Sequence, residues 1–363
     1  MSIRIKNFLT YLRKDQNKDR QYVREKTCDS LYEIFLSVYD YGGQHRYLDD
    51  ERAKSFGIIV KDMELDSNGE YTMRAGEEFF KPLRRELLEA APIDESDEEI
   101  RRHFTWFHEW PEEVRRLENG GCGSIAMDLR YKLGQLVHYY RRIGPGENAK
   151  RVKLMKLTGW RDLGLCPDIV NEVYMGMLKF GGSVSQDCRI DQSYFSAHRR
   201  EEEPHVIIML EHFYEGNENI SRAEVLVALA AMVTQMEHDY LESHCIAPVL
   251  VVSFMESFQG RIMQAHATED GLLIQKTKLH SFRTQDEFDQ SMPFFVRYTA
   301  SDRVGDTKQR VLLDLPREVQ EPADVKQVRD SMGNLSCTSP TDKVEGKAPM
   351  KSAERPLNRD NVS

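Results

Sequence analysis

The sequence predicts an α+β protein built around a mixed β-sheet, and three observations support this class. Residues 205–210 and 248–255 are runs of almost entirely apolar residues, as in strands that are buried on both faces. Between them, apolar residues recur at helical spacing over residues 221–243. Two shorter apolar runs follow, which is typical of hairpin strands. Strand, helix and strand in this order predict a right-handed βαβ unit with two parallel strands.

The helix over 221–243 and the strands after it complete a predicted α/β sheet domain at 204–314. Ser221 with Glu224 three residues later forms a capping box at the start of this helix. Its core face is expected to consist of Val225, Leu226, Leu229, Met232, Val233, Met236 and Tyr240. The later strands are expected at 260–267 and 271–277, separated by Gly-containing turns with Asp270-Gly271 at one of them, and at Phe294 to Thr299.

Residues 1–200 are predicted to form a mainly helical region with one hairpin near 57–74. Asn68-Gly69 lies between two short apolar runs, which is a hairpin signal. Helices are expected at 19–41, ending at Gly42-Gly43; at 76–91, with Pro82 marking a kink or a late start; at 97–118; at 124–142, with Ser124 as N-cap; and from Pro167 to Phe180.

The ends of the chain carry weaker signals. Met1 to Lys14 is basic and partly amphipathic, and an ordinary first helix is favoured over a transit peptide because serine is scarce. Residues 315–363 are rich in Pro, Ser and charged residues and are predicted to be disordered, since they cannot bury enough apolar surface to offset the entropy of ordering.

Composition limits the classes of function. The chain has 363 residues and a net charge of −10, which argues against general nucleic-acid affinity, although a local basic face is compatible with it. The six cysteines form no Cys-x-x-Cys pair, so no metal or cofactor is expected and the thiols are expected to be reduced. No apolar run is long enough to span a membrane. These features predict a cytoplasmic or nuclear protein that is not secreted.

The loop from Gly120 to Ser124 contains the candidate catalytic residue, Cys122. It precedes a predicted helix, whose N-terminus lowers the pKa of a thiol. The same loop is a candidate anion site through Gly120, Gly121, Gly123 and Ser124, although it lacks the Gly-Lys-Ser/Thr of a P-loop. A thiol enzyme also needs a histidine, and the sequence leaves five open: His103, His108, His138, His205 and His238.

A restriction-type nuclease core is a further alternative. Such a site needs carboxylates for a metal ion and a Glu-x-Lys on one strand. Ile274 stands two residues before Lys276, so the motif is broken, and Glu211 and Glu224 lie on different elements. A catalytically degenerate relative is compatible with this pattern. Arg261 is expected to be a solvated charge at a strand edge. The alternative is a guanidinium presented from the strand edge to an anion or a carboxylate.

Cys245-Ile-Ala-Pro-Val-Leu-Val-Val-Ser-Phe254, Gly260-Arg-Ile-Met-Gln-Ala265 and Leu272-Leu-Ile together resemble a module of uncharacterised filamentous-fungal proteins. The resemblance covers about 205–282 and rests on apolar and glycine positions, so it implies a fold and no activity. The position of some relatives near secondary-metabolite biosynthesis genes implies an accessory role, or an atypical enzyme that uses the Gly120–Ser124 loop.

No complete catalytic constellation is visible in the sequence. The leading prediction is therefore a non-catalytic intracellular protein that acts through a protein partner. The helix-rich N-terminal half and the polar C-terminal tail are compatible with this prediction.

Overall fold

The structure is a computed structural model. It describes residues 3–42, 45–65, 71–72, 77–96, 98, 100–101, 124–144, 149–162, 164, 167–180, 188–196 and 203–313. These residues belong to one compact unit, Met1–Leu315. The predicted tail at 315–363 and the predicted helix at 97–118, except residues 98, 100 and 101, lie outside the described residues.

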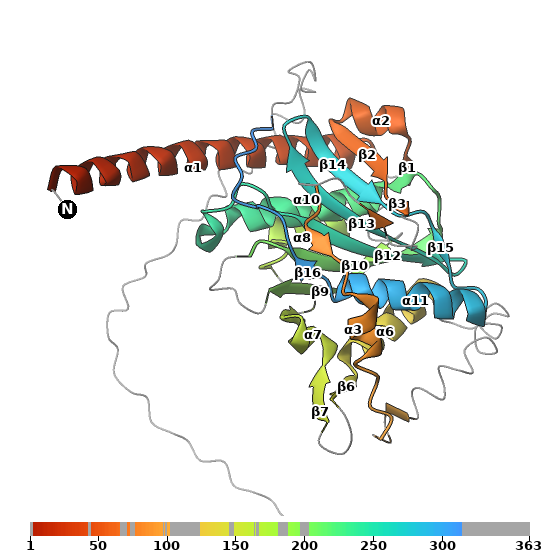
Figure 1. The fold of residues 1–363 in the computed structure, drawn as a ribbon. Helices are drawn as coiled ribbons and strands as arrows, with labels where there is room; N and C mark the ends of the chain where they lie inside the picture. Colours follow the sequence, from red (N-terminus) through yellow and green to blue (C-terminus); the bar gives the residue numbers. More distant parts are fainter. Residues whose placement is uncertain are drawn as a thin grey trace, which may run out of the picture. The chain divides into compact units, whose positions relative to one another are not determined.

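The main sheet is mixed, which confirms the α+β class (Figure 1). The strand order is β2-β14-β13-β12-β10-β9-β8, and β15 pairs with β13. The strands are β2 (Ile58–Asp62), β8 (Trp160–Asp162), β9 (Cys188–Ser196), β10 (Val206–Glu215), β12 (Val249–Glu256), β13 (Gln259–Thr268), β14 (Gly271–Lys276) and β15 (His280–Ser281). The pairs β10–β12 and β2–β14 are parallel and the others are antiparallel.

Helices cover both faces of this sheet, which explains the apolar runs. On β10, Val206 and Ile208 face one core together with α1 (Ile3–Asp40), α8 (Glu172–Phe180) and α10 (Arg222–Glu237). Ile207 and Met209 face a second core with α6 (Ile125–His138) and α11 (Gln285–Thr299). Since neighbouring residues of a strand point to opposite faces, a strand with two cores needs an apolar residue at every position.

The predicted βαβ unit is confirmed as β10, α10 and the parallel strand β12. Ser221 caps α10, and the capping box with Glu224 is present. The prediction of one apolar face was too narrow, because every residue from Arg222 to Met236 is buried. Tyr240 was wrongly placed on that face: it lies beyond α10, in the short 3-10 helix Asp239–Leu241, and is exposed.

Arg24 and Arg222 join α1 to α10, and each binds carbonyl groups at or near the C-terminal end of the other helix. Arg24 of α1 donates hydrogen bonds to the carbonyls of Met236 and Leu241, and to that of His244 at 2.8 Å, around the C-terminal end of α10. Conversely, Arg222 at the start of α10 donates from Nε to Val38 O (2.9 Å), near the C-terminal end of α1. The last carbonyls of a helix have no partner within it and attract cations. Each helix therefore provides the cap for the other.

Several predicted elements differ from the structure. The Ile58–Val60 run does not pair across Asn68-Gly69 but lies in β2, beside β14. A smaller hairpin joins β3 (Glu64–Leu65) to β4 (Tyr71–Thr72). The predicted strand at Phe294 to Thr299 is wrong: it is the end of α11, which a Thr284–Glu287 capping box starts. The helix expected at 76–91 is restricted to α3 (Arg85–Glu89), after Pro82 and the strand β5 (Phe80–Lys81).

The turn between β12 and β13 also differs from the expectation, because it contains no glycine. It consists of Ser257 and Phe258, which both have positive φ. Gly260 instead lies inside β13, where an added Cβ would be 2.9 Å from the carbonyl oxygen of Ser253. Only glycine fits this close approach.

The remaining elements lie around this central unit. Ser124 caps α6 as predicted, and α8 begins five residues later than expected. The strands β8 and β9 come from the predicted helical region. β9 pairs with β10 and β8 pairs with β9, so the sheet draws on both predicted regions. The other elements are α2 (Asp50–Ser55), α7 (Leu154–Leu157), β1 (Tyr47–Leu48), β6 (Tyr140–Ile143), β7 (Lys150–Lys153), β11 (Ile220–Ser221) and β16 (Asp302–Arg303).

We expect Arg24→Met to lower the free energy of unfolding by about 2–4 kcal/mol, because it leaves buried carbonyl groups without donors. Urea unfolding followed by circular dichroism measures this change. Lys26→Met is the matched control on the same helix: its ion pair with Asp29 is exposed, so a loss below about 0.5 kcal/mol is expected. Equal losses in the two variants would contradict the capping role of Arg24.

Candidate functional site

The predicted loop at Gly120–Ser124 is only partly described. Gly120, Gly121, Cys122 and Gly123 lie outside the described residues. The hydroxyl of Ser124 donates to the Glu256 carboxylate at 2.5 Å, and the Ile125 amide donates to the same carboxylate at 3.3 Å. The anion at the start of α6 is thus a side chain of the protein itself, in the position that a helix N-terminus favours.

The candidate histidines occupy three different environments. His138 ends α6, about 21 Å along the helix axis from Ser124, and its Nε2 lies 3.1 Å from Asp162. His205 lies in the core, where burial lowers its pKa to about 4. His238 contacts the carbonyl of Asp168 at 2.8 Å. His103 and His108 lie outside the described residues.

The described cysteines form no disulfide bonds. They are Cys28, Cys188 and Cys245. Burial raises the pKa of Cys28 to about 12 and also raises the pKa of Cys245. The thiolate is the reactive form, so Cys28 and Cys245 are poor nucleophiles at neutral pH.

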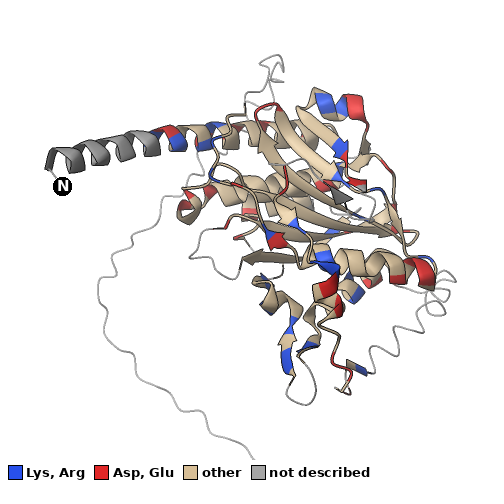
Figure 2. Cartoon of the chain, viewed as in Figure 1, with Lys and Arg blue, Asp and Glu red and all other residues tan. Residues whose placement is uncertain are grey.

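A basic segment contrasts with the acidic chain. Residues 140–162 contain two acids, Glu147 and Asp162, against seven Lys and Arg: Arg141, Arg142, Lys150, Arg151, Lys153, Lys156 and Arg161. Most of these cations lie on the hairpin of β6 and β7, which projects from the sheet in Figure 1 and carries the blue of Lys and Arg in Figure 2. We call this hairpin, with its exposed Arg142, Lys150, Arg151 and Lys153, the basic hairpin.

The strand register places two like charges directly opposite each other, because Arg142 faces Arg151. The next pair on the same face is Tyr140 with Lys153. Opposed like charges destabilise a hairpin. Asp94 offsets this repulsion, because its carboxylate lies 3.3 Å from Nε of Arg142 and 2.5 Å from Nε of Arg151.

The cations of the basic hairpin are held in place yet accessible. The guanidinium of Arg151 lies 4.9 Å from the centre of the Tyr140 ring, and the ammonium of Lys153 lies 5.4 Å from it. The side chains of Arg142 and Arg151 each keep 46% of their surface exposed beside Asp94. Lys150 and Lys156 have no acidic partner among the described residues. This surface can therefore accept further carboxylates.

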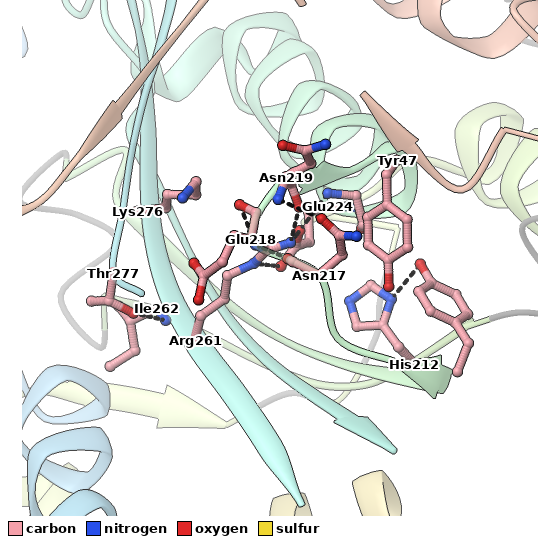
Figure 3. A network of polar contacts seen from close by, with 12 residues as sticks. Tyr47, His212, Asn217, Glu218, Asn219, Glu224, Arg261, Ile262, Lys276 and Thr277 are labelled. Carbon is pink, nitrogen blue, oxygen red and sulfur yellow. Dashed lines mark hydrogen bonds and ion pairs between the residues drawn. The ribbon is translucent and has the colours of Figure 1, made fainter. Parts of the chain in front are cut away.

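A buried ion pair forms a second polar cluster (Figure 3). Arg261 and Glu224 have no exposed side-chain surface, and Arg261 binds both carboxylate oxygens of Glu224 at 2.8 and 2.5 Å. Arg261 also donates to the carbonyls of Asn217 (2.8 Å) and Asn219 (3.0 Å). The expectation of a solvated edge charge is therefore wrong, because Arg261 is buried in β13 and its guanidinium binds a carboxylate inside the protein. Since these donors serve internal acceptors, the pair holds α10, β13 and the loop before α10 together.

The groups considered for a nuclease are bonded to other partners. Glu224 pairs with Arg261, and Glu211 accepts from Nε of Arg130 at 2.7 Å. Lys276 lies 2.5 Å from Asp62 of β2. Within the described ranges, no three His, Cys, Asp or Glu side chains are grouped so that they could hold a metal ion.

A cleft of about 970 Å³ lies between α3, β15 and α11. Its lining includes Leu88, Phe294, Arg85 and the acids Glu89 and Asp289. His280 stacks on Phe294 at 5.1 Å, and burial lowers the pKa of His280 to about 4. Its imidazole is thus neutral at neutral pH, so the cleft contains no histidine poised for proton transfer near pH 7.

Glu224 gives the fold a specific acid sensitivity. Burial alone would raise its pKa, but the attraction of Arg261 outweighs burial and lowers the pKa to about 2 from an ordinary 4.5. Because the pKa of Glu224 is lower in the folded protein than in the unfolded chain, its ionised carboxylate stabilises the folded state at pH values above 4.5. This stabilisation is lost as the pH falls from 4.5 towards 2.

We expect Glu224→Gln to lower the free energy of unfolding at pH 7 by about 3–5 kcal/mol, because Arg261 keeps its buried charge without a counter-charge. The variant should also lose part of the pH dependence between 4.5 and 2. Urea unfolding across this pH range measures both effects. Glu215→Gln is the control, because Glu215 is exposed and should change stability by less than about 0.5 kcal/mol. An unchanged acid sensitivity would contradict the role of Glu224.

Comparisons with known proteins add no relative. No family model matches the chain. Neither the curated proteins nor the solved structures give a match. Across the described helices, none is both long and apolar enough to cross a membrane. The resemblance to filamentous-fungal proteins remains a prediction, and the candidate site rests on the geometry of this chain alone.

Proposed function

We propose that this is a non-catalytic protein that binds an acidic segment of a protein partner on its basic hairpin. The observation that carries the proposal is the concentration of exposed cations on a projecting hairpin of a chain whose net charge is −10. A local field opposite in sign to the rest of the molecule selects and orients a partner of complementary charge.

Several polar groups that might serve catalysis have structural partners instead. Glu224 binds Arg261, Glu211 binds Arg130, and Glu256 caps α6. Such internal pairing favours a binding role, because a catalytic group must be able to reach a substrate.

A protein partner is favoured over a nucleic acid for two reasons. The net charge of −10 disfavours a long nucleic acid that runs beyond the hairpin over the acidic rest of the chain, whereas a short acidic segment can stay on the hairpin. Single-stranded nucleic acids also use exposed aromatic rings for base stacking. Tyr140 on this hairpin already supports Arg151 and Lys153 through cation–π contacts.

We expect the protein to bind a labelled acidic peptide, acetyl-Thr-Asp-Thr-Asp-Thr-Asp-Thr-amide, in a fluorescence anisotropy titration at low salt. The double variant Lys150→Glu/Lys153→Glu should weaken this binding by about tenfold or more, because attraction becomes repulsion. Added salt should weaken the wild-type complex as well.

The matched control is Lys26→Glu/Lys54→Glu, which reverses two exposed lysines on α1 and α2 and should leave peptide affinity unchanged. Equal affinity of the wild type and the hairpin variant would contradict the proposal. Tighter binding of a single-stranded oligothymidine than of the peptide would contradict the choice of a protein partner.

A further inference from the structure

We infer that the acidic segment binds by adding a β-strand to the outer edge of β7. This inference rests on the proposed function, because it specifies how the basic hairpin holds its partner. A two-stranded hairpin has two edges, and each edge presents backbone N–H and C=O groups that can pair with another strand. The two edges of the basic hairpin differ in this respect.

The edge of β6 is already in use. Ile93 forms an antiparallel bridge with Arg141, the Asp94 amide donates to Tyr140 O at 2.8 Å, and the Arg142 amide donates to Pro92 O at 2.9 Å. An extended segment of the chain thus lies along β6. Its acidic residue, Asp94, places its carboxylate between two arginines of the hairpin. The protein therefore contains one example of an acidic strand held by this hairpin.

The edge of β7 is open in the part of the chain that the structure describes, because β7 pairs there only with β6. Lys150 and Lys153 are exposed on this strand, whereas Val152 is buried. Residues two apart on a strand share a face, so Arg151 and Lys153 point to the same side. An added strand with acids at alternate positions would place its carboxylates beside these two cations while its backbone pairs with β7.

The same charges oppose pairing between two copies of β7. Lysine on an exposed edge repels a second basic edge, which is a common protection against aggregation. It does not repel an acidic strand. The same side chains thus oppose self-association and favour binding of a partner of opposite charge.

The test uses the full chain and two modified forms of the Thr/Asp peptide. In one form every Thr amide is N-methylated, and in the other every Asp amide is. In a strand, alternate residues direct their N–H groups to opposite edges. Strand addition therefore predicts that one methylated peptide loses affinity by about tenfold or more, whereas the other stays within about threefold of the parent peptide.

Equal effects of the two methylations, whether both peptides bind or both fail, would overturn strand addition. The proposed function has its own readout in the Lys150→Glu/Lys153→Glu variant. If charge reversal weakens binding while neither methylation does, the basic hairpin binds acidic segments through charge alone and only the inference fails. If charge reversal has no effect, the proposed function fails as well.

Discussion

Arg24 at one end of α10 and Arg261 at the other end allow this fully buried helix to remain in the interior. A buried helix cannot leave its terminal amides and carbonyls unpaired. At one end Arg24 reaches from α1 to the last carbonyls of α10. At the other end Glu224 closes the capping box and binds Arg261 from the sheet. Because α10 connects the parallel strands β10 and β12, the position of the whole sheet depends on these contacts.

Local signals in the sequence predicted the central unit well. The apolar runs indicated β10 and β12, and the Ser221–Glu224 capping box indicated the start of α10. The failure at Phe294 to Thr299 has a local cause too. An aromatic and β-branched run suggested a strand, although a second capping box, Thr284 with Glu287, marks a helix start nearby.

Other features depend on residues that are distant in the sequence. Arg261 appeared to be an edge charge because its partner Glu224 lies 37 positions away on another element. The basic hairpin is different, because its excess of Lys and Arg can be counted directly in residues 140–162. The strand register of the hairpin and the position of the Asp94 carboxylate could not be predicted from composition. Both depend on how the strands pair and on the contact between residues 91–94 and β6.

The parallel pair β2–β14 has a consequence for synthesis on the ribosome. Ile58 of β2 pairs with Leu272 of β14, and α1 packs against α10, so α1 and β2 find these partners only after a long further stretch of chain has been made. Such long-range pairing slows folding and prolongs the exposure of apolar surface. The apolar side of α1 and the strand β2 therefore stay without their native contacts until α10 and β14 have been synthesised.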